Sequence, residues 1–291
     1  MASPRQIVHQ CVQRIEGMER LDGVARPLAA GAGRLTRATP VKNALSGTWL
    51  GHPLHPVLTD LPIGAWTMAA ALDVAGGGPS AGAARRLVGA GAIAALPAAA
   101  AGWADWSDTY GADQRVGLVH ALGNLAATFL QMGSYLCRRR GHRGAGVTLS
   151  AVALGTVTVT GYLGGHLSYI RGVGVNHTAF EEPVTDWVDV ASLDDLPLDG
   201  RPLRALARGI PVMLVRRASE DVIALSATCT HAGGPLEEGK VLDGSVRCPW
   251  HGSVFRLGDG KVLRGPASTT QPVWEARIEN ARVQVRSGCG R

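Results

Sequence analysis

The chain has 291 residues, and 46% of them are hydrophobic although only 5% are aromatic. The formal net charge of +6 is spread over an arginine-rich sequence with no patch of interleaved basic and aromatic side chains, so nucleic-acid binding is not indicated. Long uncharged stretches fill the middle of the chain, whereas short alternating runs fill its C-terminal part. This distribution predicts two unlike parts and excludes a single uniform globular domain.

The first 47 residues form a polar N-terminal arm that precedes the uncharged stretches. Apolar side chains recur within it at helical spacing, namely Ile7, Val8, Cys11, Val12, Ile15 and Met18. This period predicts an amphipathic helix. We expect its apolar face to pack on the membrane domain that follows.

The sequence predicts four transmembrane helices within residues 48–170. Two stretches, 115–138 and 143–171, contain no charged residue between their ends, and 54–77 and 87–104 are nearly as apolar. A helix needs roughly 20 apolar residues to cross a bilayer. The alternative is a buried bundle in a soluble protein. We expect a four-span bundle in contact with membrane lipid.

Polar residues in these spans form a candidate redox site, because ionisable groups within a membrane are costly and usually functional. The candidates are His52, His55, Asp60, His120 and His166. In an up-down-up-down bundle the histidines lie in one leaflet. One interpretation is a haem b held by His120 together with His166 or His55, and another is a quinone site that uses Asp60 as a proton carrier. The third is that the bundle only anchors the rest of the protein.

Two of the spans begin alike, which indicates a duplicated helical hairpin. His55 is followed by Thr59, and His120 by Asn124, one turn later in each case. The other two spans end in a glycine and an aromatic residue, at Gly102-Trp103 and Gly161-Tyr162.

The run Gly51-His-Pro-Leu-His-Pro-Val-Leu-Thr-Asp-Leu-Pro-Ile-Gly-Ala-Trp66 resembles the signature of a bacterial four-span membrane family of unknown function. The likeness covers residues 48–175 and includes Arg171-Gly-Val-Gly-Val175. It implies a multi-pass membrane protein. It assigns no chemistry.

Four metal-ligating side chains stand in two short motifs of the C-terminal part, Cys229-Thr-His231 and Cys248-Pro-Trp-His251. Two thiolates and two imidazoles can hold one [2Fe–2S] cluster, with both cysteines on one iron and both histidines on the other. A structural zinc ion is the alternative, but zinc sites usually use C-x-x-C and H-x-x-H spacings. The C-x-H first motif therefore favours the cluster.

With their flanks, Cys229-Thr-His-Ala-Gly-Gly-Pro-Leu and Cys248-Pro-Trp-His-Gly-Ser-Val-Phe, these motifs resemble the Rieske family over residues 185–286. The resemblance implies an all-β electron-transfer domain at 185–291, after a glycine-rich linker at 171–184. Residues 252–291 contain no histidine, so we expect no mononuclear iron site and no substrate site of the chain's own.

Four residues beside the ligands bear on the type of Rieske domain that the resemblance implies. Gly234 and Trp250 occupy the positions of the disulfide found in cytochrome bc complexes, and Phe255 replaces a tyrosine that donates to a cysteine sulfur. Ser253 matches a serine that bonds a bridging sulfide. Because hydrogen bonds to sulfur stabilise the reduced cluster, their loss predicts a ferredoxin-type domain with a potential of roughly −150 to +50 mV.

The sequence as a whole therefore predicts a membrane-anchored Rieske protein that passes electrons between redox partner proteins, with quinone as a further candidate partner. The alternative is a redox-sensing or anchoring subunit of a larger oxidoreductase complex. The side of the membrane stays open. Arginines in the loops favour a cytoplasmic location for those loops, but the arm carries seven basic residues between Arg5 and Lys42 on the opposite side.

Overall fold

The structure is a computed structural model that describes residues 3–288, so the outermost residues of the predicted arm and of the predicted Rieske domain lie outside it. The chain forms two compact units. The first contains Met1–Arg37 and Leu54–Val173, and the second contains Ala38–Pro53 and Gly174–Arg291. The last residues of the predicted arm thus belong with the C-terminal domain, and the chain passes between the units three times. The predicted domain boundaries remain a prediction.

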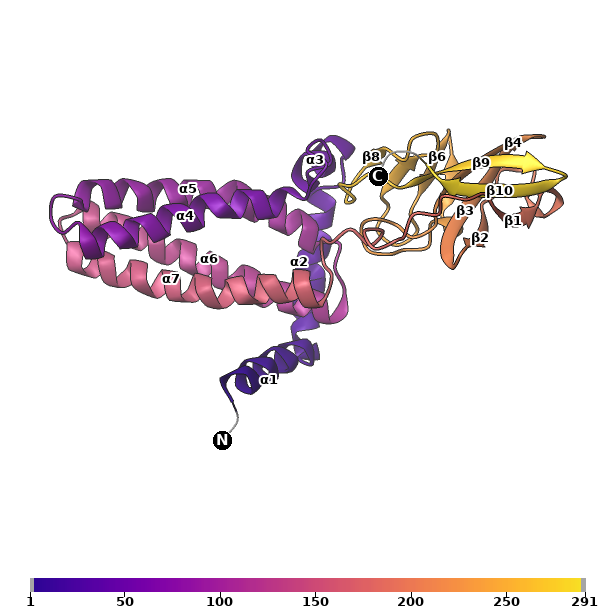
Figure 1. The fold of residues 1–291 in the computed structure, drawn as a ribbon. Helices are drawn as coiled ribbons and strands as arrows, with labels where there is room; N and C mark the ends of the chain where they lie inside the picture. The colour runs from indigo at the N-terminus through magenta and orange to yellow at the C-terminus, as the bar shows by residue number, and fades with distance from the viewer. Residues whose placement is uncertain (1–2, 289–291) are drawn as a thin grey trace. The chain divides into compact units, whose positions relative to one another are not determined.

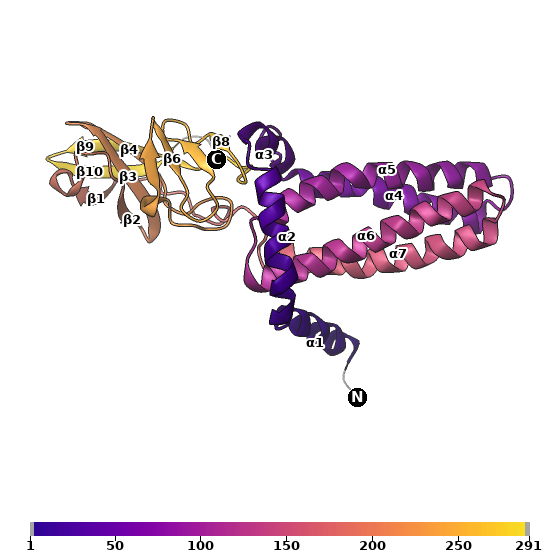
Figure 2. The same ribbon diagram turned by 180° about the vertical axis from the view of Figure 1, so that it is seen from behind.

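The first unit is helical (Figure 1). Its elements are α1 (Pro4–Glu16), a 3-10 turn (Glu19–Leu21), α2 (Asp22–Leu35), α4 (Leu54–Ala75), α5 (Ala81–Trp106), α6 (Gly111–Arg139), α7 (Arg143–Gly165) and a π-helical turn (His166–Ile170). Helices α4 to α7 run side by side as a bundle in both views (Figures 1 and 2). All four are long and apolar enough to cross a membrane.

The bundle has apolar residues outside and polar residues inside. Large apolar side chains on its surface are solvent-accessible, among them Ile93 and Phe129. Inside, Gln131, Ser134 and Ser150 are buried, and the Ser150 hydroxyl donates to Gln131 Oε1 over 2.9 Å. Such a surface is costly in water, whereas hydrocarbon favours it and requires polar groups to pair inside. The arrangement therefore favours the membrane bundle over the soluble one.

A buried ion pair joins the ends of α4 and α6. Asp73 receives both terminal nitrogens of Arg138, one of them at 2.8 Å, and Arg143 approaches the same carboxylate at 3.4 Å. The Asp73 and Arg138 side chains are each only 3% exposed. Asp73 therefore has a structural partner, which accounts for a charge inside an apolar span.

The second unit contains α3 (Thr39–Ser46) and two antiparallel sheets (Figure 1). The six-stranded sheet has the order β1 (Val188–Ser192), β10 (Arg282–Ser287), β9 (Val273–Glu279), β4 (Asp221–Ser226), β3 (Ile210–Ala218) and β2 (Leu203–Ala207). The four-stranded sheet has the order β5 (Lys240–Leu242), β6 (Ser245–Arg247), β7 (Val254–Arg256) and β8 (Val262–Arg264). Short 3-10 turns at Leu193–Asp195 and Leu236–Glu238 complete it.

Strand β3 is buried on both faces because it separates two hydrophobic cores. Met213 and Val215 point into the core that also contains the cysteines of the two motifs, whereas Val212 and Leu214 point into the other core. Successive side chains of a strand alternate between faces, so a continuous apolar run is what such a strand requires. The predicted fold class is confirmed in its two parts, a bundle of four long apolar helices and an all-β C-terminal domain.

The ion pair at the end of α4 can be tested by removing one charge. We expect Asp73→Asn to lower the stability of the bundle by about 3–5 kcal/mol, because it leaves the Arg138 charge buried without a counter-charge. Thermal unfolding of the protein in detergent measures this. Asp60→Asn, an exposed aspartate on the same helix, is the control, and equal destabilisation by both variants would contradict the interpretation.

Candidate cluster-binding site

The first ligand loop follows β4 and is closed by backbone hydrogen bonds. The Cys229 N–H donates to Gly234 O over 2.9 Å, and the Gly233 N–H donates to Cys229 O over 2.9 Å. Gly233 has a φ of 74°, which a residue with a side chain rarely adopts. The tight turn therefore depends on glycine and brings His231 back beside Cys229.

The second ligand loop, between β6 and β7, has the same construction. The Cys248 N–H donates to Ser253 O over 2.8 Å, and the Gly252 N–H donates to Cys248 O over 3.2 Å. Gly252 has a φ of 71°. Two similar turns thus present a cysteine and a histidine each.

The two loops bring all four side chains together at one end of the domain. Both cysteines are buried, and the Cys229 thiol donates a hydrogen bond to the Cys248 sulfur. This bond and burial raise the pKa of Cys229, and the same bond lowers the pKa of Cys248. The His231 and His251 rings lie 4.9 Å apart between centroids, with an angle of 78° between their planes. The set is thus two sulfurs beside two imidazoles.

Backbone amides also point at each sulfur. The N–H groups of His231 and Ala232 donate to Cys229, and those of Trp250 and His251 donate to Cys248. Each donor lies two or three residues after its own cysteine, so the turn itself supplies it. These bonds stabilise negative charge on sulfur, which is what a thiolate ligand requires.

The residues present fit a [2Fe–2S] cluster. His231 Nδ1 is buried and has no hydrogen-bond partner within the described part of the chain, so its lone pair is available to a metal. Burial lowers the pKa of His231 to about 3, with smaller electrostatic contributions from His251, Lys42 and His177. A neutral imidazole is the form that ligates. Within residues 3–288 no three His, Cys, Asp or Glu side chains converge on one point, but each iron of the cluster takes only two.

The structure places the residues named beside the ligands in or next to the two ligand loops. A Cβ at Gly234 would lie 2.9 Å from Cys248 Sγ and 3.1 Å from Trp250 Cγ, so no side chain fits there. Phe255 packs in the core that contains both cysteines, and Ser253 Oγ accepts from the Ala267 N–H over 3.0 Å. Space as well as sequence therefore rules out a disulfide between the two loops at this position.

Sequence analysis missed Gln271, which holds the first ligand loop. This fully buried amide donates to Ser226 O and Thr228 O, each over 2.7 Å, and accepts from the Thr230 N–H over 3.1 Å. A glutamine more than 40 positions from its partners gives no spacing signal. Its side-chain amide forms the hydrogen bonds that the backbone of a neighbouring strand would otherwise form with this loop.

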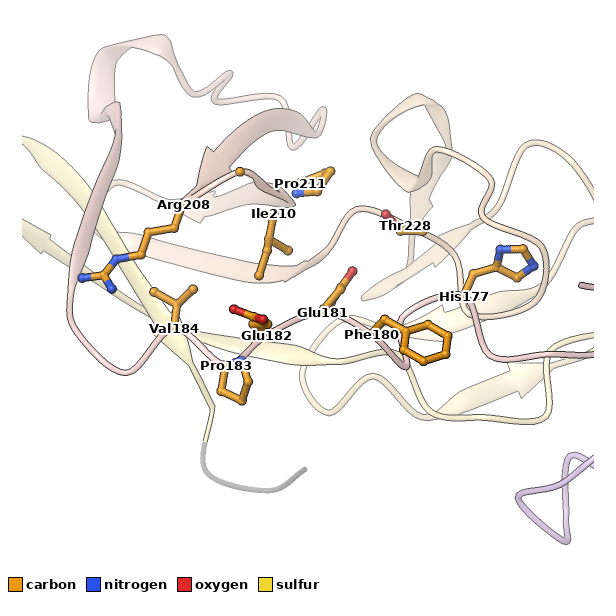
Figure 3. Close-up of a pocket in the computed structure, with 11 residues that line it drawn as sticks. His177, Phe180, Glu181, Glu182, Pro183, Val184, Arg208, Ile210, Pro211 and Thr228 are labelled. Atoms are coloured by element: carbon orange, nitrogen blue, oxygen red, sulfur yellow. The ribbon is translucent and has the colours of Figure 1, made fainter.

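His177 was also missed, and it lies against the first ligand loop. Its N–H donates to Thr230 O over 3.1 Å, and a Cβ at Gly233 would lie 3.3 Å from its Nδ1. An open groove of about 610 Å³ begins here, with His177 at one end and Arg208 at the other (Figure 3). Phe180 stands almost fully exposed beside it. The groove thus borders the first ligand loop without entering it.

In the bundle, the structure brings two of the five candidate residues together. The His55 and His120 ring centroids lie 6.4 Å apart, with an angle of 81° between the ring planes. Each Nδ1 bonds a backbone carbonyl of the next helix, Ala98 O at 2.8 Å and Thr160 O at 2.7 Å. Asn124 Nδ2 lies 3.2 Å from His120 Nε2. Each histidine thus ties one helical hairpin together.

The other three candidates lie apart from this pair. His166 Nε2 lies 3.0 Å from Glu16 Oε1 of α1, so His166 helps to hold the amphipathic helix α1 against the bundle. His52 is exposed and bonds the neighbouring Pro53 carbonyl, and Asp60 is exposed on α4. Of the two predicted histidine pairings, the geometry therefore favours His120 with His55.

Comparison with known proteins agrees with this construction. The Rieske [2Fe-2S] domain model matches residues 186–275, and the predicted membrane protein model DUF2231 matches residues 51–177. The chain is 31% identical over 101 residues to the ferredoxin component of the 2,4-dinitrotoluene dioxygenase system of Burkholderia sp. (strain RASC), covering 35% of this chain and 95% of that protein. It is 30% identical over 102 residues to human apoptosis-inducing factor 3, but that match covers 35% of this chain and only 17% of that protein.

Among solved structures, the ferredoxin of carbazole 1,9a-dioxygenase from Nocardioides aromaticivorans is 26% identical, with a TM-score of 0.34, covering 36% of this chain and all of that one. The family model and the ferredoxin component of Burkholderia show that the chain belongs to the Rieske [2Fe–2S] family through its C-terminal domain, and the preceding part matches the predicted membrane protein family DUF2231. The domain is an electron-transfer module of the ferredoxin type, and its cofactor is a [2Fe–2S] cluster.

The role of Gln271 leads to a testable expectation. Gln271→Leu should leave Ser226 O, Thr228 O and the Thr230 N–H buried and unpaired, at about 1–3 kcal/mol for each group. We expect the variant to contain less iron and acid-labile sulfide per chain and to unfold at lower temperature. Gln284→Leu, which loses only two surface bonds from Arg277, should match the wild type. Full cluster content in the Gln271 variant would show that the first ligand loop keeps its conformation without the bonds from Gln271.

Proposed function

We propose that this protein is a membrane-anchored electron carrier in which Cys229, His231, Cys248 and His251 ligate the [2Fe–2S] cluster. The observation that carries the proposal is the convergence of two buried thiols and two imidazoles, one of them with an unpaired buried Nδ1. The bound cluster accepts and returns one electron at a time. The four residues hold it, and the backbone amides beside them fix the sulfurs.

A redox partner protein is proposed to dock at the histidine end of the domain. Trp250 is 54% exposed, and its ring centroid lies 6.3 Å from that of His251. An exposed aromatic side chain beside a ligand is a suitable contact for a partner, since aromatic residues dominate the energetics of interfaces. The relatives named as dioxygenase ferredoxin components support an oxidoreductase as the class of partner.

The four-helix bundle is proposed to anchor the carrier in the cell membrane as a multi-pass domain surrounded by lipid. Its apolar surface and the polar residues buried inside it support this role. An anchor keeps the carrier close to membrane-bound donors or acceptors.

The ligand assignment is tested by substitution in the full-length protein. Cys229→Ser and His251→Ala should each abolish the paramagnetic signal of the reduced cluster, because each variant leaves one iron with a single protein ligand. The protein should still be found in the membrane fraction. Cys137→Ser, on α6, should keep a full signal. A Rieske-type signal in either ligand variant would refute the assignment.

The same preparation tests the ferredoxin type of the cluster. We expect a midpoint potential of roughly −150 to +50 mV in a redox titration followed by paramagnetic resonance. The reason is Phe255, which supplies no hydroxyl to the sulfurs. A midpoint in the upper part of the Rieske range, above roughly +150 mV, would contradict it.

A second candidate function, a membrane redox centre, is favoured by the His55 and His120 pair. Two imidazoles on different helices each have Nδ1 bonded to a carbonyl, as metal-ligating histidines do, and a ligand at His120 Nε2 would replace its contact with Asn124 Nδ2. If they bind haem b, the reduced-minus-oxidised spectrum should contain sharp haem bands stoichiometric with protein, and His120→Ala should remove them without loss of the cluster. A spectrum that shows only the broad bleaching of the cluster would mean that His55 and His120 have a packing role and bind no haem.

A further inference from the structure

Helix α2 packs against one end of the four-helix bundle. Ala25 and Ala29 of α2 are buried against Trp106, the last residue of α5. An ion pair of 3.1 Å joins Asp22 of α2 to Arg115 of α6. Both views show α2 running crosswise to the four long helices at this end (Figures 1 and 2). If those helices span a bilayer, α2 therefore lies along the plane of the membrane.

The same end of the bundle carries exposed aromatic side chains with polar groups. Trp103 lies near the end of α5, Tyr110 directly precedes α6, and Tyr162 lies near the end of α7. All three are at least 40% exposed. Tryptophan and tyrosine are enriched at the level of the lipid headgroups. These side chains therefore place this end of the bundle, and α2 with it, at the membrane–water interface.

The surface of α2 has an apolar stripe that its contact with the bundle does not use. The buried face consists of small residues, Ala25, Ala29 and Ala32. Beside it lie three large apolar side chains that are 52%, 39% and 82% exposed, namely Val24, Leu28 and Leu35. Residues four and seven positions apart share one face of a helix, so these three form a continuous stripe. The remaining surface carries exposed arginines, Arg26 and Arg34.

The charge around the stripe suits anionic lipid. The first 47 residues contain seven basic and three acidic side chains. Two of the acids have partners, since Glu16 lies 3.0 Å from His166 and Asp22 bonds Arg26 and Arg115. Two copies of this basic surface would repel each other, whereas anionic headgroups attract it. An apolar stripe beside arginines is the pattern of a helix that lies in the interface.

We propose that α2 is an interfacial helix whose stripe, Val24, Leu28 and Leu35, inserts into the boundary between the lipid headgroups and the acyl chains. The proposal rests on the membrane anchoring proposed above. The bilayer around the bundle covers the stripe, and the arginines on the remaining surface bind phosphates of anionic headgroups. The arm thereby adds a contact with the membrane surface to the four spans.

The experiment places a nitroxide spin label on single cysteines of the full-length protein in vesicles of phosphatidylcholine and phosphatidylglycerol. Cys11, Cys137 and Cys289 are replaced by serine in every variant. The label measures the ratio of collisions with oxygen to collisions with a water-soluble nickel complex. For Leu28→Cys this ratio should be about tenfold higher than for Ala30→Cys, because the apolar face of an interfacial helix lies roughly 5–10 Å into the headgroup and acyl boundary. Ala30 is exposed on another side of α2.

Two results would overturn the proposal. Equal ratios at positions 28 and 30 would place the stripe in water. Exclusion of both reagents at position 28 would mean that protein, such as a second copy of the chain, covers the stripe.

A third label distinguishes the failure of this proposal from the failure of the proposed anchor. Phe129 is 61% exposed on the surface of α6. If the label of Phe129→Cys collides mainly with the nickel complex, the bundle does not lie in lipid and the anchor is wrong. If it collides mainly with oxygen while the label at position 28 collides with nickel, the anchor stands and the interfacial helix is rejected.

A charge in the stripe gives a test in which water and lipid predict opposite signs. Val24 lies in the first turn of α2, where a negative charge stabilises a helix in water. Val24→Asp should nevertheless accelerate amide hydrogen exchange in α2 in vesicles about threefold, because the carboxylate loses hydration in the acyl boundary. Gly23→Asp adds the same charge at an exposed site with room for a side chain and should not accelerate exchange. Slower exchange in Val24→Asp would refute the proposal.

Discussion

Most of the second unit serves to hold two sulfurs and two imidazoles together in a site that is largely shielded from water. Each cysteine begins a turn whose next amides point back at its own sulfur, and a glycine with positive φ closes each turn. The loops have left the sheets, so their remaining backbone groups need partners. Gln271 supplies these for the first loop, and Arg264 donates to Gly252 O of the second. The surrounding strands contribute mainly the rigid walls.

The bundle satisfies a different requirement, which is to pair its polar groups without water. Its two hairpins do this in the same way. His55 bonds Ala98 O and lies where a Cβ on Gly102 would be 2.8 Å away, and His120 bonds Thr160 O and lies where a Cβ on Gly164 would be 3.0 Å away. In both hairpins the glycine comes four residues after the carbonyl. This agreement supports the duplication that the two His motifs indicate, and it pairs Gly102 with Gly164 and not with Gly161.

The ligands could be found from the sequence because their geometry is local. A cysteine and a histidine two or three positions apart can occupy one tight turn and little else, so the spacing of Cys229 with His231 and of Cys248 with His251 carries most of the information about the site. The spans could be found for a similar reason, since an uncharged run is a property of one helix. Pro62 and Pro97 lie within α4 and α5 without ending either helix, because packed neighbours in a bundle override local propensity.

The contacts that the sequence did not reveal are those between distant positions. Gln271 reaches back about 40 residues to the first ligand loop, and Asn43 reaches 220 residues forward to Leu263. No period or motif marks such pairs. Lys42 is the clearest example. In the sequence it is the last of seven basic residues in the arm, and it contributes only to the net charge of that arm. In the structure the same residue lies on α3, which packs against the Rieske domain, and it is only 3% exposed. Its surroundings, and not its charge alone, decide what the residue does.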